Sequence, residues 1–246
     1  MAMSGLKLAA IYGIRPHLLG FCGPQGESLN KALFNFISGK KISEKKIRKI
    51  FKKFEAAFCY YKLIARYNKI RDPFSQKVVS AYWIGNRLLE KVPVTALRQM
   101  VKREFSRPGL LLPKIAESKA NAIPSGALAH HSFHVLFIGS ITGRVKLQGK
   151  LFDLCRIGWG KITKIEPKKG KIRVKYQPLI SCKGKYILGG LTEKDIIWNK
   201  NFLPKANVGQ IISFHWSQAV QALNIDEVKN LNKYTRKTLA TISPTL

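Results

Sequence analysis

The sequence predicts an α+β fold: a helical N-terminal half, then a C-terminal half with a small antiparallel β-sheet or barrel, and C-terminal helices. Between residues 28 and 107, apolar residues recur at steps of three and four, the spacing that aligns them on one face of a helix. After residue 130, short β-branched and aromatic runs alternate with turns, which is typical of antiparallel strands.

The N-terminal half divides at capping and helix-breaking residues. Ser28 and the pair Asp72-Pro73 are expected helix starts, and Gly39 is an expected stop. The glycines and prolines of residues 11–26 predict an irregular segment packed on the core. Residues 110–129 are expected to form a linker-like connection with one helical turn. Helices are therefore expected over residues 28–39, 43–68, 72–85 and 93–107, with a short turn or helix over 86–91.

The C-terminal half is expected to consist mainly of strands. The turn at residues 166–170 joins two of them into a hairpin. Strands are expected over residues 134–138, 156–165, 171–178, 186–191, 195–198 and 210–216, and helices over 218–223 and from Asp226 onward. We expect an α-helical region over residues 1–125 and a β-rich region over 126–246, closed by two C-terminal helices, together forming one integrated unit.

Composition excludes several classes of protein. The 246 residues are 46% hydrophobic, which is enough for a buried core. No run approaches the roughly 18 apolar residues of a membrane span, and the first residues lack the pattern of a secretion signal. The four cysteines are scattered without a C-x-x-C pair, which argues against a zinc ribbon or a thioredoxin-type site. We expect a reduced, cytoplasmic protein without a membrane span.

The charge is strongly basic, at +31 from 44 Lys and Arg against 13 acids. Such a surface attracts nucleic acid or an acidic protein partner, although a solvated lysine surface gives the same count. Two patches, at residues 40–53 and 161–175, make RNA or DNA binding the alternative function. The residues that it would use are Lys45, Lys46, Lys49, Lys52, Lys53, Lys168, Lys169, Lys171 and Arg173.

Standard catalytic motifs are absent from the sequence. It has no P-loop, no G-x-G-x-x-G after a strand, no H-E-x-x-H and no G-x-S-x-G. The few acids form no close pair except Asp226-Glu227 at a helix start, which argues against a two-carboxylate hydrolase or an acidic Mg²⁺ site. Whether the protein is an enzyme stays open.

Three of the five histidines fall within five residues, at His130, His131 and His134. Histidine is the commonest metal ligand, and on a helix these three would lie close together. On the expected strand, His130 and His134 lie about 13 Å apart and His131 faces away, so an ion would need Cys155, His215 or Asp153 as further ligands. The alternative is a hydrogen-bonded core histidine at position 134 and a loop-ordering role for the other two.

Two other segments carry residues that suit chemistry. Cys155 beside Arg156 is a candidate for a lowered thiol pKa, and the glycines around Trp159 indicate close approach of another backbone or a ligand. Cys22, with Arg15 nearby in a glycine-flanked loop, is a candidate nucleophile or ligand. A buried, inert Cys155 and a purely structural loop are the alternatives.

Motifs spread over the chain resemble a family of uncharacterised prokaryotic proteins, a domain of unknown function. They lie at Gly20–Pro24, Trp83–Asn86, His130–Val135, Cys155–Gly160 and Ser213–Trp216. The genes of that family sometimes lie near those of nickel–iron hydrogenases. The resemblance implies an accessory role in hydrogenase maturation or assembly, and supplies no established active site.

The sequence thus predicts one candidate site with a metal ion as its possible cofactor, of undetermined identity. Its central residues are histidines and cysteines that must converge from distant segments. The candidate residues are His130, His131, His134, Cys22, Arg15, Cys155, Arg156, Trp159 and His215.

Overall fold

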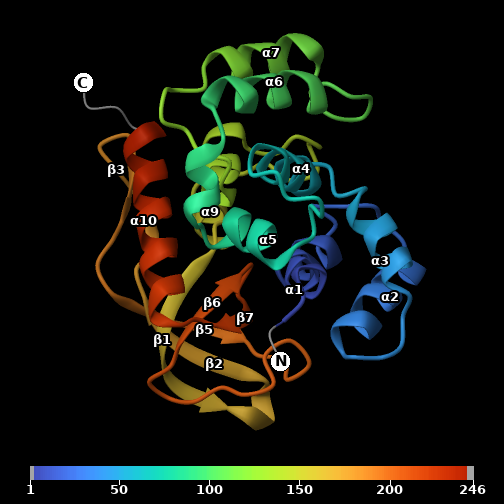
Figure 1. Ribbon diagram of the computed structural model, residues 1–246. Helices are drawn as coiled ribbons and strands as arrows, with labels where there is room; N and C mark the ends of the chain where they lie inside the picture. The colour runs from blue at the N-terminus through green and yellow to red at the C-terminus, as the bar shows by residue number, and fades with distance from the viewer. Residues whose placement is uncertain (1–2, 243–246) are drawn as a thin grey trace.

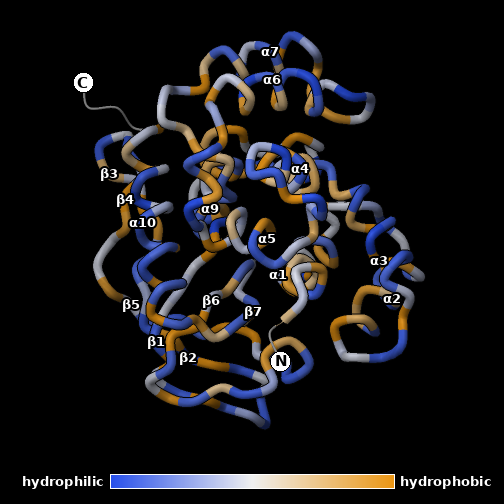
Figure 2. The backbone as a smooth tube through the Cα atoms, viewed as in Figure 1, coloured by the Kyte–Doolittle hydropathy of each residue, from blue (hydrophilic) through white to orange (hydrophobic). Residues whose placement is uncertain are grey.

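The computed structural model describes residues 3–242 and has the α+β fold that the sequence predicts. In Figure 1 the N-terminal helices surround α1 and α5, while the strands form a barrel on the other side of these two helices, with α10 alongside. One continuous hydrophobic core contains residues of both halves, from Leu6 to Tyr234. Figure 2 shows hydrophilic residues over α3 and on the outer turns of α6 and α7.

The N-terminal half contains seven α-helices among the described residues. Their apolar faces bury aromatic side chains such as Tyr12, Tyr61 and Tyr82 in the shared core. They are α1 (Gly5–Leu18), α2 (Glu27–Ile37), α3 (Glu44–Phe51), α4 (Ala57–Tyr67), α5 (Gln76–Trp83), α6 (Val94–Glu104) and α7 (Pro113–Asn121), with the 3-10 turn η1 (Arg87–Lys91) after α5.

The C-terminal half begins with short helical pieces and continues with strands. The helical pieces are α8 (His131–Phe133), the π-helical turn η2 (His134–Ile138) and α9 (Lys150–Cys155). The strands are β1 (Gly158–Glu166), β2 (Lys171–Tyr176), β3 (Leu179–Cys182), β4 (Lys185–Leu188), β5 (Thr192–Ile197), β6 (Ile211–His215) and β7 (Gln218–Ala222). The 3-10 turn η3 (Pro167–Lys169) joins β1 to β2, and α10 (Ile225–Ile242) follows the strands.

Five strands close a barrel in the order β1-β2-β5-β7-β6. Its pairs are antiparallel except for the parallel contact between β5 and β7, so the sheet is mixed. Strands β3 and β4 form a separate two-stranded sheet. Alternate residues of the barrel strands, among them Ile162, Val174 and Phe214, fill its interior. Gly158 and Gly160 allow the close approach that the sequence indicated, because a Cβ there would meet Phe214 and the backbone of Lys175.

Several sequence-based expectations about the elements are wrong. Residues 134–138 form a π-helical turn instead of a strand, and Cys155 ends helix α9 instead of lying on a strand. The expected helix over 218–223 is strand β7, because it pairs with β6, so one C-terminal helix closes the described part instead of two. The expected helix over 43–68 is broken into α3 and α4, and α1 extends into the segment expected to be irregular.

Within residues 3–242, none of the helices combines the length and the apolar character needed to cross a membrane.

Candidate functional site

A small cavity of about 70 Å³ lies where α1, α5, α8, α9 and the end of β6 meet. Its walls are mostly apolar and aromatic. Five of the nine candidate residues line it: Cys22, His131, His134, Cys155 and His215. They come from four separate segments of the chain, since only His131 and His134 are neighbours in sequence, so the tertiary fold brings these segments together. The cavity is large enough for an ion and one or two waters.

Three of these side chains form a group with metal-ligand spacing. One potential ligand atom from each of His131, Cys155 and His215 lies within 4.8 Å of the other two. All three residues are buried, and the imidazole rings of the two histidines have centroids 5.1 Å apart. Two imidazoles and a thiol are a donor set that suits Zn²⁺, Ni²⁺ and copper, and does not suit Mg²⁺ or Ca²⁺.

The orientation of His215 follows from a proline in α1. Pro16 has no backbone N–H, so it leaves the carbonyl of Tyr12, four residues earlier, without its helical partner. The Nδ1 of His215 donates to that carbonyl over 2.8 Å. Since Nδ1 carries the proton, Nε2 holds the free lone pair. This Nε2 is buried and has no hydrogen-bond partner among the described residues.

His131 is held by hydrogen bonds at both ring nitrogens. Nε2 lies 2.8 Å from the carbonyl oxygen of Cys155, which can only accept, so Nε2 is the donor. Nδ1 then accepts from the hydroxyl of Tyr82 over 3.1 Å. If the bond to Cys155 is kept, Nδ1 is the atom left for an ion, which must displace the Tyr82 hydroxyl.

The aromatic residues that support the two histidines were not among the predicted site residues. The Trp83 ring stacks on Tyr12 at 5.1 Å and packs against His131 at 4.5 Å and His215 at 5.5 Å between centroids. The indole N–H of Trp83 donates to the hydroxyl of Tyr61. Tyr82 looks like an ordinary core residue of an amphipathic helix, and Trp83 stands out only within the motif Trp83–Asn86 of the family resemblance, which assigns it no role at the site.

Burial sets the protonation states in the cavity. It lowers the pKa of His131 well below its ordinary value and that of His215 to about 4, so both rings are neutral at pH 7. Burial also raises the pKa of the Cys155 thiol well above its ordinary value and that of Cys22 to about 12. Of the two alternatives for Cys155, the raised pKa supports the buried, inert thiol over the lowered thiol pKa. A bound cation would deprotonate such a thiol.

Arg156 has a structural partner that explains why it does not activate Cys155. Its guanidinium is 1% exposed and lies 2.8 Å from the carboxylate of Asp153. The same carboxylate accepts from the hydroxyl of Tyr176 and the backbone N–H of Leu179. Arg156 also donates to the carbonyl of Gln177 and lies over the ring of Trp159. This network fixes α9 to the barrel and takes Asp153 out of the set of free ligands.

Four candidate residues lie outside the cavity lining: Arg15, His130, Arg156 and Trp159. His130 caps α8 through Nδ1 and packs against Tyr234. Because the segment is helical, His131 and His134 share one face, so the expectation that His131 faces away from His134 is wrong. His134 lies 3.4 Å from the hydroxyl of Tyr60 and is not part of the three-ligand group.

The two basic patches lie on separate elements. Lys45, Lys46 and Lys49 are exposed on α3, with Lys52 and Lys53 directly after it. Lys168 and Lys169 are exposed in η3, and Lys171 and Arg173 are on β2. Arg173 pairs with Asp195 and Lys169 with Glu166. The support for nucleic-acid binding at these two patches is therefore still their positive charge alone.

A family model described as a family of unknown function, DUF6390, matches residues 1–246, so the chain belongs to this family. Neither the curated proteins nor the solved structures gave a match to the chain.

Proposed function

We propose that this protein binds a divalent transition-metal ion through His131, Cys155 and His215, and that it serves as an accessory protein in the maturation of a nickel–iron hydrogenase. The observation that carries the metal site is the buried, unpartnered Nε2 of His215 beside a thiol and a second neutral imidazole. Leaving a buried polar atom without a partner is costly, and a bound cation would remove that cost.

The donor set supports a site that exchanges its ion. Three protein ligands leave a coordination position open, as in metal sites that take up a further ligand. The cavity extends past the three ligands to Cys22 and His134, so a donor from another molecule or a second cysteine can complete the coordination. Because the ion must deprotonate Cys155, binding releases a proton and weakens as the pH falls.

Nickel is the first ion to test, because the family resemblance includes gene neighbourhoods with nickel–iron hydrogenases. Imidazole and thiolate donors accept Ni²⁺ as well as Zn²⁺, so the geometry is compatible with either. An accessory protein that passes nickel on needs an open coordination position more than it needs a catalytic base, and three protein ligands leave such a position.

The test is the affinity of untagged, chelator-treated protein for Ni²⁺ and Zn²⁺, measured by competition with a chromophoric chelator. Changing the partners of metal ligands costs 10–100-fold in affinity, so losing a ligand by H215A or C155S is expected to cost at least about 100-fold. C59S, which alters a buried thiol elsewhere, and H134N, which alters the cavity wall, serve as controls and are expected to change it less than H215A.

Equal loss in H215A and H134N, or no binding by the unaltered protein, would exclude the metal site. Tight Zn²⁺ binding without Ni²⁺ binding would exclude the nickel role and keep the metal site. In a cell that makes a nickel–iron hydrogenase, replacing the chromosomal copy with C155S is expected to lower hydrogenase activity and added nickel to restore part of it.

A further inference from the structure

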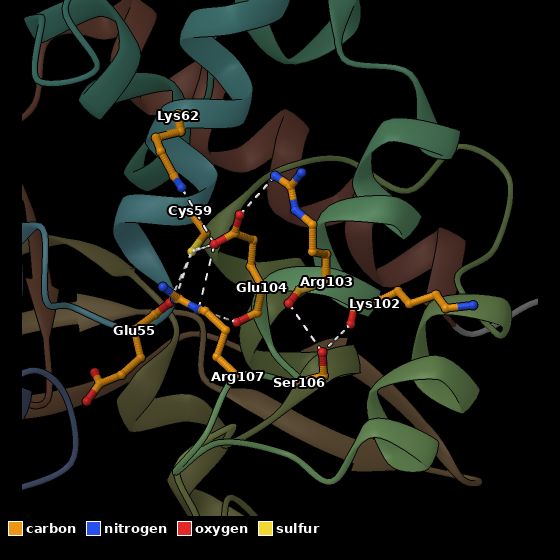
Figure 3. Close-up of polar contacts among 8 residues, drawn as sticks. All are labelled: Glu55, Cys59, Lys62, Lys102, Arg103, Glu104, Ser106 and Arg107. Atoms are coloured by element: carbon orange, nitrogen blue, oxygen red, sulfur yellow. Dashed lines mark hydrogen bonds and ion pairs between the residues drawn. The ribbon is translucent and has the colours of Figure 1, made fainter.

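A second, open cleft of about 660 Å³ lies between α4 and α6, away from the histidine cavity. Four basic residues line it: Lys62 and Arg66 on α4, and Lys102 and Arg103 on α6. Glu104 is the only acid in its lining. Figure 3 shows Lys62 and Arg103 reaching Glu104 from the two helices, while Lys102 points away from it. Lys102 pairs with Glu117 of α7.

The spacing of the cations is unfavourable to helix stability. Lys62 and Arg66 are four residues apart on α4, and Arg103 of α6 lines the same cleft. Like charges at this spacing lie on the same face and repel each other. This pair and Arg103 therefore surround one cleft, which leaves a local surplus of positive charge that an anion would neutralise.

The Glu104 carboxylate holds part of this arrangement in place. Its side chain is 11% exposed and contacts Lys62 at 3.5 Å, Arg103 at 3.0 Å and Arg107 at 3.7 Å. Arg107 also donates to the Glu104 carbonyl over 2.8 Å. One carboxylate neutralises one of three cations, so the others keep unused N–H donors beside the cleft.

The lining of the cleft also has an apolar part. Leu63, Ala96 and Met100 line it, and the half-buried ring of Tyr67 stands beside Arg66. The volume lies within the range of small-molecule sites, which combine apolar walls with a few charged groups. The cleft therefore offers cations for a chain of phosphates and an apolar wall with an aromatic ring for the group that carries them.

From this geometry we infer a binding site for a polyphosphate-bearing anion between α4 and α6. A nucleotide and inorganic polyphosphate share the chemistry that the cations recognise. The inference is independent of the metal site, since the two share no lining residue.

The test is isothermal titration of the whole chain with ATP and with tripolyphosphate, without added metal, at about 0.15 M salt, where long-range attraction is screened. R66Q and R103Q each remove one exposed cation from the cleft. Each is expected to weaken binding about tenfold, as expected for the loss of a charge-assisted hydrogen bond. K45Q and K168Q remove one exposed cation elsewhere and are expected to change the affinity less than about twofold.

Tighter binding of ATP than of tripolyphosphate would identify a nucleotide as the ligand, and the reverse order would identify inorganic polyphosphate. Failure of both to bind would overturn the inference. It would be overturned equally if K168Q weakened binding as much as R66Q, because the attraction would then come from the net charge of the chain. Thermal unfolding of each variant checks that the exposed substitutions leave the fold intact.

Discussion

Two carboxylates in this chain are equally buried and face very different cations. The side chains of Asp153 and Glu104 are each 11% exposed. Asp153 pairs with Arg156, which is 1% exposed, whereas Lys62, Arg103 and Arg107 around Glu104 are 43%, 78% and 50% exposed. The first pair is sealed next to the histidine cavity, and the second cluster opens onto the cleft between α4 and α6.

The difference separates charges that stabilise the fold from charges that remain available to bind a ligand. A buried cation depends on its partner, because water cannot replace the lost contact. Exposed cations keep their hydration, so they can rearrange around a ligand. The network around Asp153 fixes α9 and hence Cys155, while the cluster around Glu104 presents charge to solvent.

The largest expected difference between the two regions is in the free energy of unfolding when each carboxylate is replaced by its amide. D153N leaves Arg156 buried without a counter-charge, so it should lower the free energy of unfolding by about 3–5 kcal/mol. E104Q leaves cations that water still reaches, so its cost should be about 1 kcal/mol. Urea unfolding followed by circular dichroism measures both. Equal costs would show that the environment of the cation does not separate the two regions.

The second-largest effect is expected from acid, which should destabilise the region around the histidine cavity. Burial lowers the pKa of His130 and of His134 to about 3, that of His215 to about 4 and that of His131 well below its ordinary value. The unfolded chain binds protons near pH 6.5 while the folded chain does not, so stability is full above that pH and falls as the pH drops toward 4.

Each of these histidines contributes up to about 1.4 kcal/mol per pH unit in that window, so the four give up to about 5.5 kcal/mol per unit. Urea unfolding of metal-free protein at several pH values measures this slope. H130N is expected to remove about a quarter of it. An unchanged slope in H130N, or flat stability between pH 6.5 and 4, would contradict neutral buried histidines.

Added salt is expected to weaken ligand binding at the cleft about tenfold more than metal binding at the cavity. Raising the salt from about 0.05 to about 0.5 M screens exposed cations, so tripolyphosphate affinity at the cleft should fall by about tenfold or more. Metal affinity at the cavity should change much less, because its ligands are buried and neutral before binding. Parallel titrations of both ligands measure this, and an equal salt dependence would be inconsistent with a closed cavity and an open cleft.

The smallest effect is expected from restoring one backbone donor. P16A adds an N–H that competes with His215 for the carbonyl of Tyr12. Since that carbonyl has two lone pairs, metal affinity should fall by about tenfold at most, the lower end for a ligand's supporting partner. P113A, at the first turn of α7 where an N–H needs no helical partner, is the matched control. If P16A and P113A changed the metal affinity equally, Pro16 would have no specific effect on the metal site.

Sequence patterns predicted the fold class and most strands, because alternation and turns are local. They failed where short apolar runs fit helix and strand equally well, as at residues 134–138 and 218–223. They also failed at Pro16, because its lost hydrogen bond is compensated by His215 from the distant strand β6.

The candidate site was predictable by residue type and not by geometry. Histidine and cysteine chemistry pointed to His131, Cys155 and His215, while Tyr82 and Trp83 carry no such signal. The site is built from contacts between segments that lie up to about two hundred residues apart, such as the hydrogen bond between Tyr12 and His215. No local sequence pattern encodes such contacts. The burial that neutralises the histidines and raises the thiol pKa of Cys155 is likewise a property of the assembled core.

The most direct test of the central claim is the absorption spectrum of the protein loaded with Co²⁺, a spectroscopic substitute for Zn²⁺ and Ni²⁺. A thiolate-to-cobalt charge-transfer band is expected in the unaltered protein and in C59S. It should be absent in C155S and strongly weakened in H215A. A band that persists in C155S, or a spectrum of hydrated cobalt in the unaltered protein, would contradict a metal site at His131, Cys155 and His215.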